Sequence, residues 1–92
     1  PDFVFMKKEA ADFLVDKGIR AVGIDYFSID ASDSDEPHTH NAFFTADVLI
    51  YEGLDLRNVC EGKYYFIGLP LKIQNAEGSP VRALLFDAEY ND

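Results

Sequence analysis

The sequence predicts an α/β fold, a mixed sheet with flanking helices, and three observations support this class. A helical pattern from Lys7 to Lys17 is followed by a short apolar stretch, Ile19–Asp25. A second helical pattern and a second apolar stretch lie between residues 39 and 52. Residues 63–87 are rich in aromatic and β-branched side chains, which favour strands. The alternation of helix and strand, followed by more strands, predicts one mixed sheet.

The first predicted helix is amphipathic and has a clear end. Its apolar stripe has spacings of three and four residues and comprises Ala10, Phe13, Leu14 and the aliphatic stem of Lys17. Gly18 follows directly, and glycine is typical of the residue that ends a helix. The start is less well marked, because Met6, Lys7 and Lys8 are poor N-cap residues. Ile19–Asp25 then predicts a short buried strand.

A polar loop separates this strand from the second predicted helix. The loop, Ser28–Pro37, is dense in Asp, Ser and Pro. Thr39–Asp47 predicts a short helix whose apolar side holds Phe43 and Phe44. Val48–Glu52 follows as a second short strand.

The last part of the chain predicts two strands joined by a short turn. Leu54–Val59 could form one helical turn before them. Lys63–Ile73 predicts one long strand, or two strands broken at Pro70. Asn75–Pro80 predicts a turn, and Val81–Asp87 a final strand. Because the connection is short, the last two strands are expected to be antiparallel.

Composition and charge limit the classes of partner. The chain has 92 residues, enough for one domain at most, with 48% hydrophobic residues. Its net charge of −9 disfavours binding to nucleic acid and to anionic membranes. It contains no run of about 18 apolar residues and no signal-peptide pattern, so we expect a cytoplasmic protein. Its single cysteine, Cys60, is expected to be a partly buried, unreactive thiol.

Glu52 is the first candidate functional residue. Alternate residues of a strand share a face, so Val48 and Ile50 lie on the face of Glu52, and Leu49 and Tyr51 on the other. Both faces are apolar, which predicts a central strand. A carboxylate at the end of such a strand must be paired or bound to a cation, unless it simply reaches solvent there. Open α/β sheets bind ligands at this end of their strands.

His40 is the second candidate. If a helix begins near residue 39, His40 shares a face with Phe43 and Phe44 and points inward. An inward histidine beside Glu52 would supply two ligands for zinc or manganese. The alternative is a half-buried histidine that only makes hydrogen bonds. His38 is expected to face water.

Other catalytic motifs are absent from the sequence. It contains no GxSxG, no phosphate-binding loop, no GxGxxG and no CxxC. Asp25 ends the first predicted strand and Asp30 lies beyond it, and both could line a site, or could cap turns, which is the commoner use.

Several stretches together resemble one known family. They are residues 9–30 (EAADFLVDKGIRAVGIDYFSID), the H-x11-E spacing from His40 to Glu52, LPLKI at 69–73 and GSPVRALL at 78–85. In this order they resemble the C-terminal half of the cyclase family of metal-dependent hydrolases, whose best known member is kynurenine formamidase (arylformamidase). The resemblance extends over nearly the whole chain.

The resemblance implies a fold, a reaction and a metal site. The fold would be the swivelling β/β/α architecture of the family. The reaction would be hydrolysis of an amide-type or cyclic C–N bond in a small-molecule substrate, with water activated by a divalent metal such as zinc or manganese. Matching the late His and Glu of the family residue by residue implies that His40 and Glu52 are metal ligands. The resemblance also implies that the protein forms homo-oligomers.

The sequence also departs from the family pattern. The family's main motif, His-x-Gly-Thr-His-x-Asp-x-Pro-x-His, has no counterpart, and the chain has only two histidines. We therefore assign no catalytic residue. Residues 1–92 are expected to form a single incomplete domain, inactive without a missing N-terminal half. The alternative is a non-catalytic association module that uses the aromatic strand segment Lys63–Phe66 and has no metal dependence.

Overall fold

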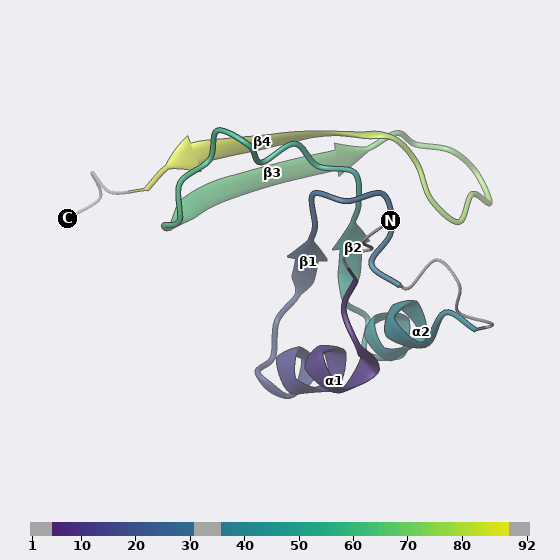
Figure 1. The fold of residues 1–92 in the computed structure, drawn as a ribbon. Coiled ribbons are helices and arrows are strands. Elements are labelled where there is room, and N and C mark those ends of the chain that lie inside the picture. The colour runs from purple at the N-terminus through teal and green to yellow at the C-terminus, as the bar shows by residue number, and fades with distance from the viewer. Residues whose placement is uncertain (1–4, 31–35, 89–92) are drawn as a thin grey trace. The chain divides into compact units, whose positions relative to one another are not determined.

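The computed structural model describes residues 5–30 and 36–88 and has a mixed α/β fold (Figure 1). It consists of two compact units, Pro1–Arg57 and Asn58–Asp92. In the described residues the strands form two separate two-stranded sheets, so the prediction of one sheet is wrong. The mixed α/β class itself is confirmed. Residues 31–35 of the predicted loop Ser28–Pro37 lie outside the described residues.

Helix α1, Lys8–Asp16, matches the predicted helix in position but not in orientation. Its buried face is formed by Ala11, Leu14 and Val15. Phe13 is 59% exposed, and the Lys17 ammonium lies 5.1 Å from the centre of its ring. Two neighbouring stripes of this helix have apolar residues three and four positions apart. The predicted stripe contains Phe13, but the stripe that is buried contains Ala11. The predicted end is correct, because Gly18 adopts φ +79° directly after the helix.

Two short parallel strands organise the first unit. Strand β1, Ala21–Gly23, pairs with β2, Leu49–Tyr51, in register from Ala21 opposite Leu49 to Gly23 opposite Tyr51. Both strands are shorter than predicted. Within residues 5–30 and 36–88, β2 pairs with β1 alone and Leu49 is exposed, so the prediction of a central strand is wrong. Because the strands are parallel, the loops that follow them leave from the same end of the sheet.

Helix α2, His38–Thr45, turns one of its two phenylalanines inward. Phe43 is fully buried, whereas Phe44 is 57% exposed, so only one of the two predicted core residues is correct. Adjacent helical positions point about 100° apart, and the buried pair is Thr39 and Phe43, one turn apart. Among the described residues of the first unit, the fully or nearly fully buried hydrophobic side chains are Ala11, Ile29, Phe43 and Val48.

The second unit is an antiparallel hairpin, as predicted. Strand β3, Tyr64–Pro70, pairs with β4, Val81–Asp87, and ends at the proline that the sequence analysis marked as a possible break. The predicted helical turn at Leu54–Val59 is wrong. The carboxylate of Asp55 accepts hydrogen bonds from the Arg57 backbone N–H (3.3 Å) and from its guanidinium, and this local pairing replaces the helical pattern. Cys60 is exposed, not partly buried.

The hairpin carries large apolar side chains that remain exposed. On β3 the alternate residues Tyr65, Ile67 and Leu69 share one face, and their register partners on β4 include Leu84 and Phe86. All five are exposed. An isolated two-stranded hairpin is marginally stable in water, so this apolar face is suited to packing against another surface.

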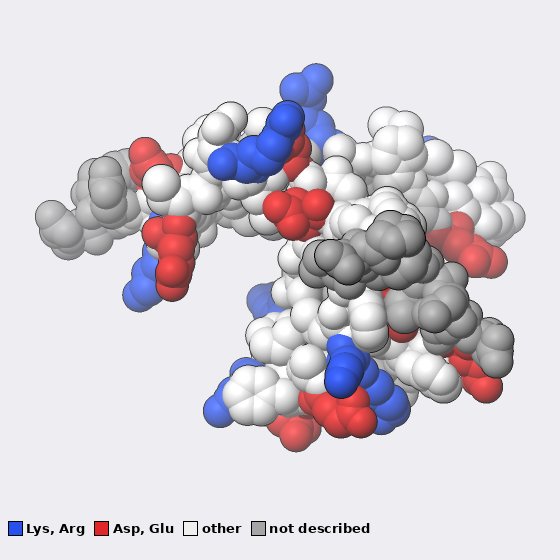
Figure 2. All heavy atoms as spheres, in the orientation of Figure 1, with Lys and Arg blue, Asp and Glu red and all other residues white. Residues whose placement is uncertain are grey.

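Charges of both signs are spread over the face shown in Figure 2, and the Lys and Arg side chains visible there do not form a continuous patch. Two ion pairs join neighbouring residues, Lys8 with Asp12 and Arg57 with Asp55. In the part of the chain that the structure describes, no helix is long and apolar enough to cross a membrane.

Replacing Phe43 by alanine should destabilise the first unit by about 3–5 kcal/mol, because it leaves a cavity in a core of few residues. Phe43→Leu should cost less and keep the transition measurable. Phe44→Ala is the matched control on the next residue, and it should change stability far less. Urea unfolding followed by circular dichroism tests this, and equal losses at the two positions would contradict the packing described.

Candidate metal site

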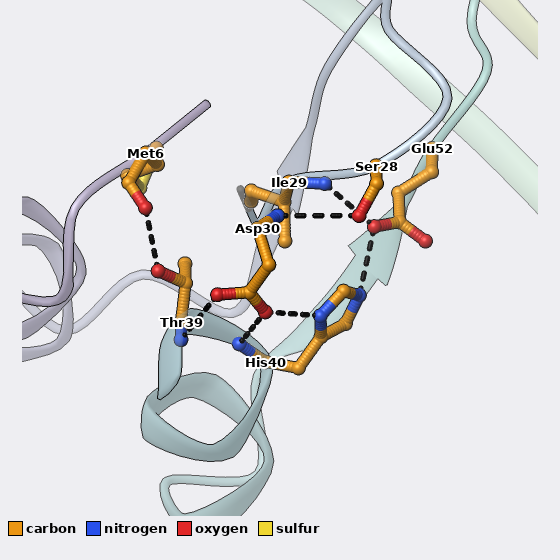
Figure 3. A network of polar contacts seen from close by, with 7 residues as sticks. All are labelled: Met6, Ser28, Ile29, Asp30, Thr39, His40 and Glu52. Atoms are coloured by element: carbon orange, nitrogen blue, oxygen red, sulfur yellow. Dashed lines mark hydrogen bonds and ion pairs between the residues drawn. The ribbon is translucent and has the colours of Figure 1, made fainter. Parts of the chain in front are cut away.

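Three polar side chains from three segments of the first unit form a row of contacts, with His40 in the middle (Figure 3). Asp30 lies in the loop after β1, His40 in the first turn of α2, and Glu52 directly after β2. Their side chains are 11%, 21% and 29% exposed, respectively. The two residues predicted as metal ligands, His40 and Glu52, are thus brought into direct contact.

His40 lies between the two carboxylates. Its Nε2 atom is 2.8 Å from Oε2 of Glu52. On the other side of the ring, Nδ1 makes a short contact with Oδ2 of Asp30. The ring of Phe44 flanks the imidazole at a centroid distance of 5.8 Å. Each ring nitrogen therefore has a carboxylate partner, and these two contacts restrict rotation of the ring.

Glu52 is oriented by the backbone. Its Oε2 atom accepts a hydrogen bond of 2.8 Å from the Ile29 N–H. The next residue, Gly53, has φ +71° and donates its N–H to the Tyr26 carbonyl at 2.7 Å. The positive φ favours glycine at this position. The chain turns directly after Glu52, which leaves the carboxylate facing His40.

Asp30 accepts hydrogen bonds from the beginning of α2. Its Oδ1 accepts from the Thr39 N–H at 2.8 Å, and its Oδ2 from the His40 N–H at 2.9 Å. These N–H groups have no partner within the helix, and Pro37 at the N-cap position supplies no side-chain bond. The Thr39 hydroxyl donates in turn to the Met6 carbonyl at 2.5 Å. The Asp30 carboxylate thus caps a helix that begins eight residues later in the chain.

The pKa of Asp30 is lowered from its ordinary value. Burial is the largest single influence and raises the pKa, but the hydrogen bonds from the backbone of His40 and Thr39 and the interaction with the His40 ring together outweigh it. Asp30 is therefore ionised at neutral pH. Since an ionised carboxylate has no proton to donate, the hydrogen in its contact with the imidazole belongs to Nδ1.

The contact between His40 Nε2 and Glu52 Oε2 also needs one hydrogen. A divalent cation can replace that hydrogen, because a neutral imidazole nitrogen and a carboxylate oxygen are both good ligands for zinc and similar metals. Both oxygens of Asp30 already accept hydrogen bonds from N–H groups. The two atoms that could bind one cation are therefore Nε2 of His40 and Oε2 of Glu52. Among the described residues, no group of three or more His, Cys, Asp and Glu side chains is arranged to hold a metal ion.

The remaining sequence candidates lie elsewhere. His38 is exposed, as predicted, and Asp25 is exposed and has no part in the network of Figure 3. Asp30, predicted either to line a site or to cap a turn, caps a helix and also contacts His40. The hydrogen bond from the Ile29 N–H to Glu52 was not predicted, because residue type does not indicate which backbone N–H will donate. Pro37 has no side-chain acceptor to cap the helix that follows it, and this could have indicated that a more distant residue caps the helix.

The chain is similar in sequence to kynurenine formamidases. It is 40% identical over 86 residues to the kynurenine formamidase of Bacillus anthracis and 41% identical over 86 residues to that of Bacillus cytotoxicus. Each match covers 92% of this chain and 41% of the relative. The chain therefore spans about two fifths of the length of these curated relatives. No family model matches it.

Two solved structures are similar to the chain. One is described as a potential metal-dependent hydrolase with cyclase activity, with a TM-score of 0.82 and 43% sequence identity. The other is a predicted metal-dependent hydrolase from Bacillus stearothermophilus, with a TM-score of 0.81 and 43% identity. Each match covers 90% of this chain, and 41% or 40% of the solved one.

Acidification should destabilise the first unit through Asp30. Because the pKa of Asp30 is lower in the folded chain than its ordinary value of 3.8, its contribution is present above that value and is lost as the pH falls through the folded pKa. Urea unfolding from neutral pH to below the ordinary value should show this loss, and Asp30→Asn should reduce the slope in that window. Asp25→Asn is the control, and an unchanged slope in Asp30→Asn would contradict the assignment.

Proposed function

Because this chain is a homologue of the kynurenine formamidases and of metal-dependent hydrolases along nearly its whole length, we propose that it supplies two metal ligands to such an enzyme. The ligands are Nε2 of His40 and a carboxylate oxygen of Glu52. The reaction would be hydrolysis of an amide-type or cyclic C–N bond in a small-molecule substrate. The complete protein would have the swivelling β/β/α architecture of the cyclase family.

The observation that carries this proposal is the 2.8 Å distance between His40 Nε2 and Glu52 Oε2. One cation can contact two donor atoms that lie this close together. Both donors are held by other groups, since Asp30 contacts the far side of the imidazole and the Ile29 N–H binds the carboxylate. Such outer contacts are typical of metal-binding histidines and carboxylates.

The residues of this chain have two roles at the site: some would bind the metal, and others orient the ligands. His40 and Glu52 would hold the metal, and the Ile29 N–H keeps the carboxylate turned toward the histidine. A divalent ion, zinc or manganese, supplies Lewis-acid polarisation of a carbonyl and activation of water when bound. Since His40 and Glu52 are two ligands, further ligands and the general base would come from a part of the enzyme outside these residues.

A second candidate function, an association module, is supported by the hairpin. Strands β3 and β4 place five exposed large apolar side chains on one face, which is more than scattered surface residues would give. The same face could pack against the rest of a longer enzyme or against a second copy of the chain. This candidate predicts folding and assembly without any dependence on metal.

Removal of either ligand should weaken metal binding by at least about tenfold, since even residues that only support a ligand cost about 10- to 100-fold. Calorimetric titration of zinc and of manganese into the wild type, His40→Ala and Glu52→Gln measures this. His38→Ala is the matched control, because it removes an exposed histidine two residues away. If metal binds equally to all four proteins, His40 and Glu52 are not ligands.

Replacing Ile67 or Leu84 by lysine should weaken self-association, because a charge in an apolar interface is costly. Sedimentation velocity at several protein concentrations provides the measurement. Leu71→Lys is the control, since Leu71 is exposed but lies beyond the end of β3. Sedimentation as a monomer at every concentration by the wild-type chain would count against association between copies.

A further inference from the structure

The Asp30 carboxylate makes more contacts than a helix cap requires. A capping side chain ordinarily accepts one bond from an N–H at the beginning of a helix. Asp30 accepts two, from Thr39 and His40, and its Oδ2 also contacts the His40 imidazole at Nδ1. The backbone and the ring of the same residue therefore share one oxygen atom.

This sharing fixes the position of the imidazole. With the His40 N–H and Nδ1 both directed at Oδ2, rotation of the side chain about either of its bonds would break one of the contacts. The remaining nitrogen, Nε2, is then turned toward Glu52, 2.8 Å away. The Nδ1 proton also leaves Nε2 as the ring nitrogen that can bind a cation.

We propose that Asp30 is a positioning residue, which links the beginning of helix α2 to the metal-binding face of His40. The role rests on the proposed metal site, but the contacts that carry it are present without metal. In this role Asp30 does not touch metal or substrate. It selects the tautomer and the orientation of the histidine, and the same carboxylate stabilises the turn of helix from which the histidine projects.

The chemistry of the site requires a carboxylate. An ionised carboxylate accepts hydrogen bonds at both oxygens, and here both face N–H donors. Asparagine has the same shape but carries two donor hydrogens on one side. In one orientation of the amide, its NH₂ would face the Thr39 N–H; in the other, it would face the N–H donors of His40. Asp30→Asn therefore tests the positioning role with little change in volume.

Nuclear magnetic resonance of the histidine rings tests the proposal directly. Long-range proton–nitrogen spectra show which ring nitrogen carries a hydrogen, and the chain has only two histidines. The wild type should show a hydrogen-bonded Nδ1–H resonance, protected from exchange. It should be lost in His40→Ala and in Asp30→Asn, and retained in Glu52→Gln. His38 serves as the internal control, since its spectrum should not change in Asp30→Asn.

Metal affinity and stability separate positioning from capping alone. Zinc should bind Asp30→Asn about 10- to 100-fold more weakly than the wild type. If Asp30 only capped α2, Asp30→Asn would lower the melting temperature equally in the wild type and in a His40→Ala background. Positioning predicts a smaller loss in the His40→Ala background, because the contact with the ring is already gone.

Each outcome has a definite reading. A wild-type spectrum with the hydrogen on Nε2 and none on Nδ1 overturns the proposal, even if Asp30→Asn fails to fold. The proposal is also overturned if the wild type binds zinc and Asp30→Asn binds it with an affinity within threefold of the wild type. A residue that supports a metal ligand is expected to change the affinity by at least ~10-fold. If the wild type binds no zinc, His40 and Glu52 do not hold the ion without the further ligands of a complete site. The Nδ1 resonance and the melting temperatures then still decide whether Asp30 holds the ring.

Discussion

The short segment formed by Ile29 and Asp30 holds the first unit together. The Ile29 side chain is fully buried, its carbonyl accepts a hydrogen bond of 2.9 Å from the Met6 N–H, and its own N–H binds Glu52. The adjacent Asp30 carboxylate binds the beginning of α2. Two consecutive residues thus connect the segment before α1, the second helix and the end of β2. The positions of His40 and Glu52 follow from these connections.

The parts of the fold that the sequence predicts well are those marked by local chemistry. Gly18 ends the first helix where a left-handed residue is needed, and Pro70 ends β3 because it lacks an N–H. The parts that fail depend on packing or on competing contacts. Spacing alone cannot tell the stripe of Phe13 from the stripe of Ala11, and the pairing of Asp55 with its neighbour overrides a weak helical pattern.

The candidate site shows the same division. That His40 and Glu52 converge follows from two rules of position, since one lies on an inward helical face and the other at the carboxyl end of a strand. The double use of Asp30 does not follow from any pattern, because its partners lie nine and ten residues away across a loop. The Ile29 N–H could be found only from coordinates, since every residue but proline offers one.

The closeness of these residues along the chain bears on the order in which the protein folds. The contacts of His40 close loops of only 10 and 12 residues, to Asp30 and to Glu52. The entropy lost in closing a loop grows with the logarithm of its length, so we expect these contacts to form early in folding. Ligands contributed from a remote part of a longer chain would arrive later, at a pair already in place. In kinetic terms, this stretch would act as a nucleus around which the rest of the metal shell assembles.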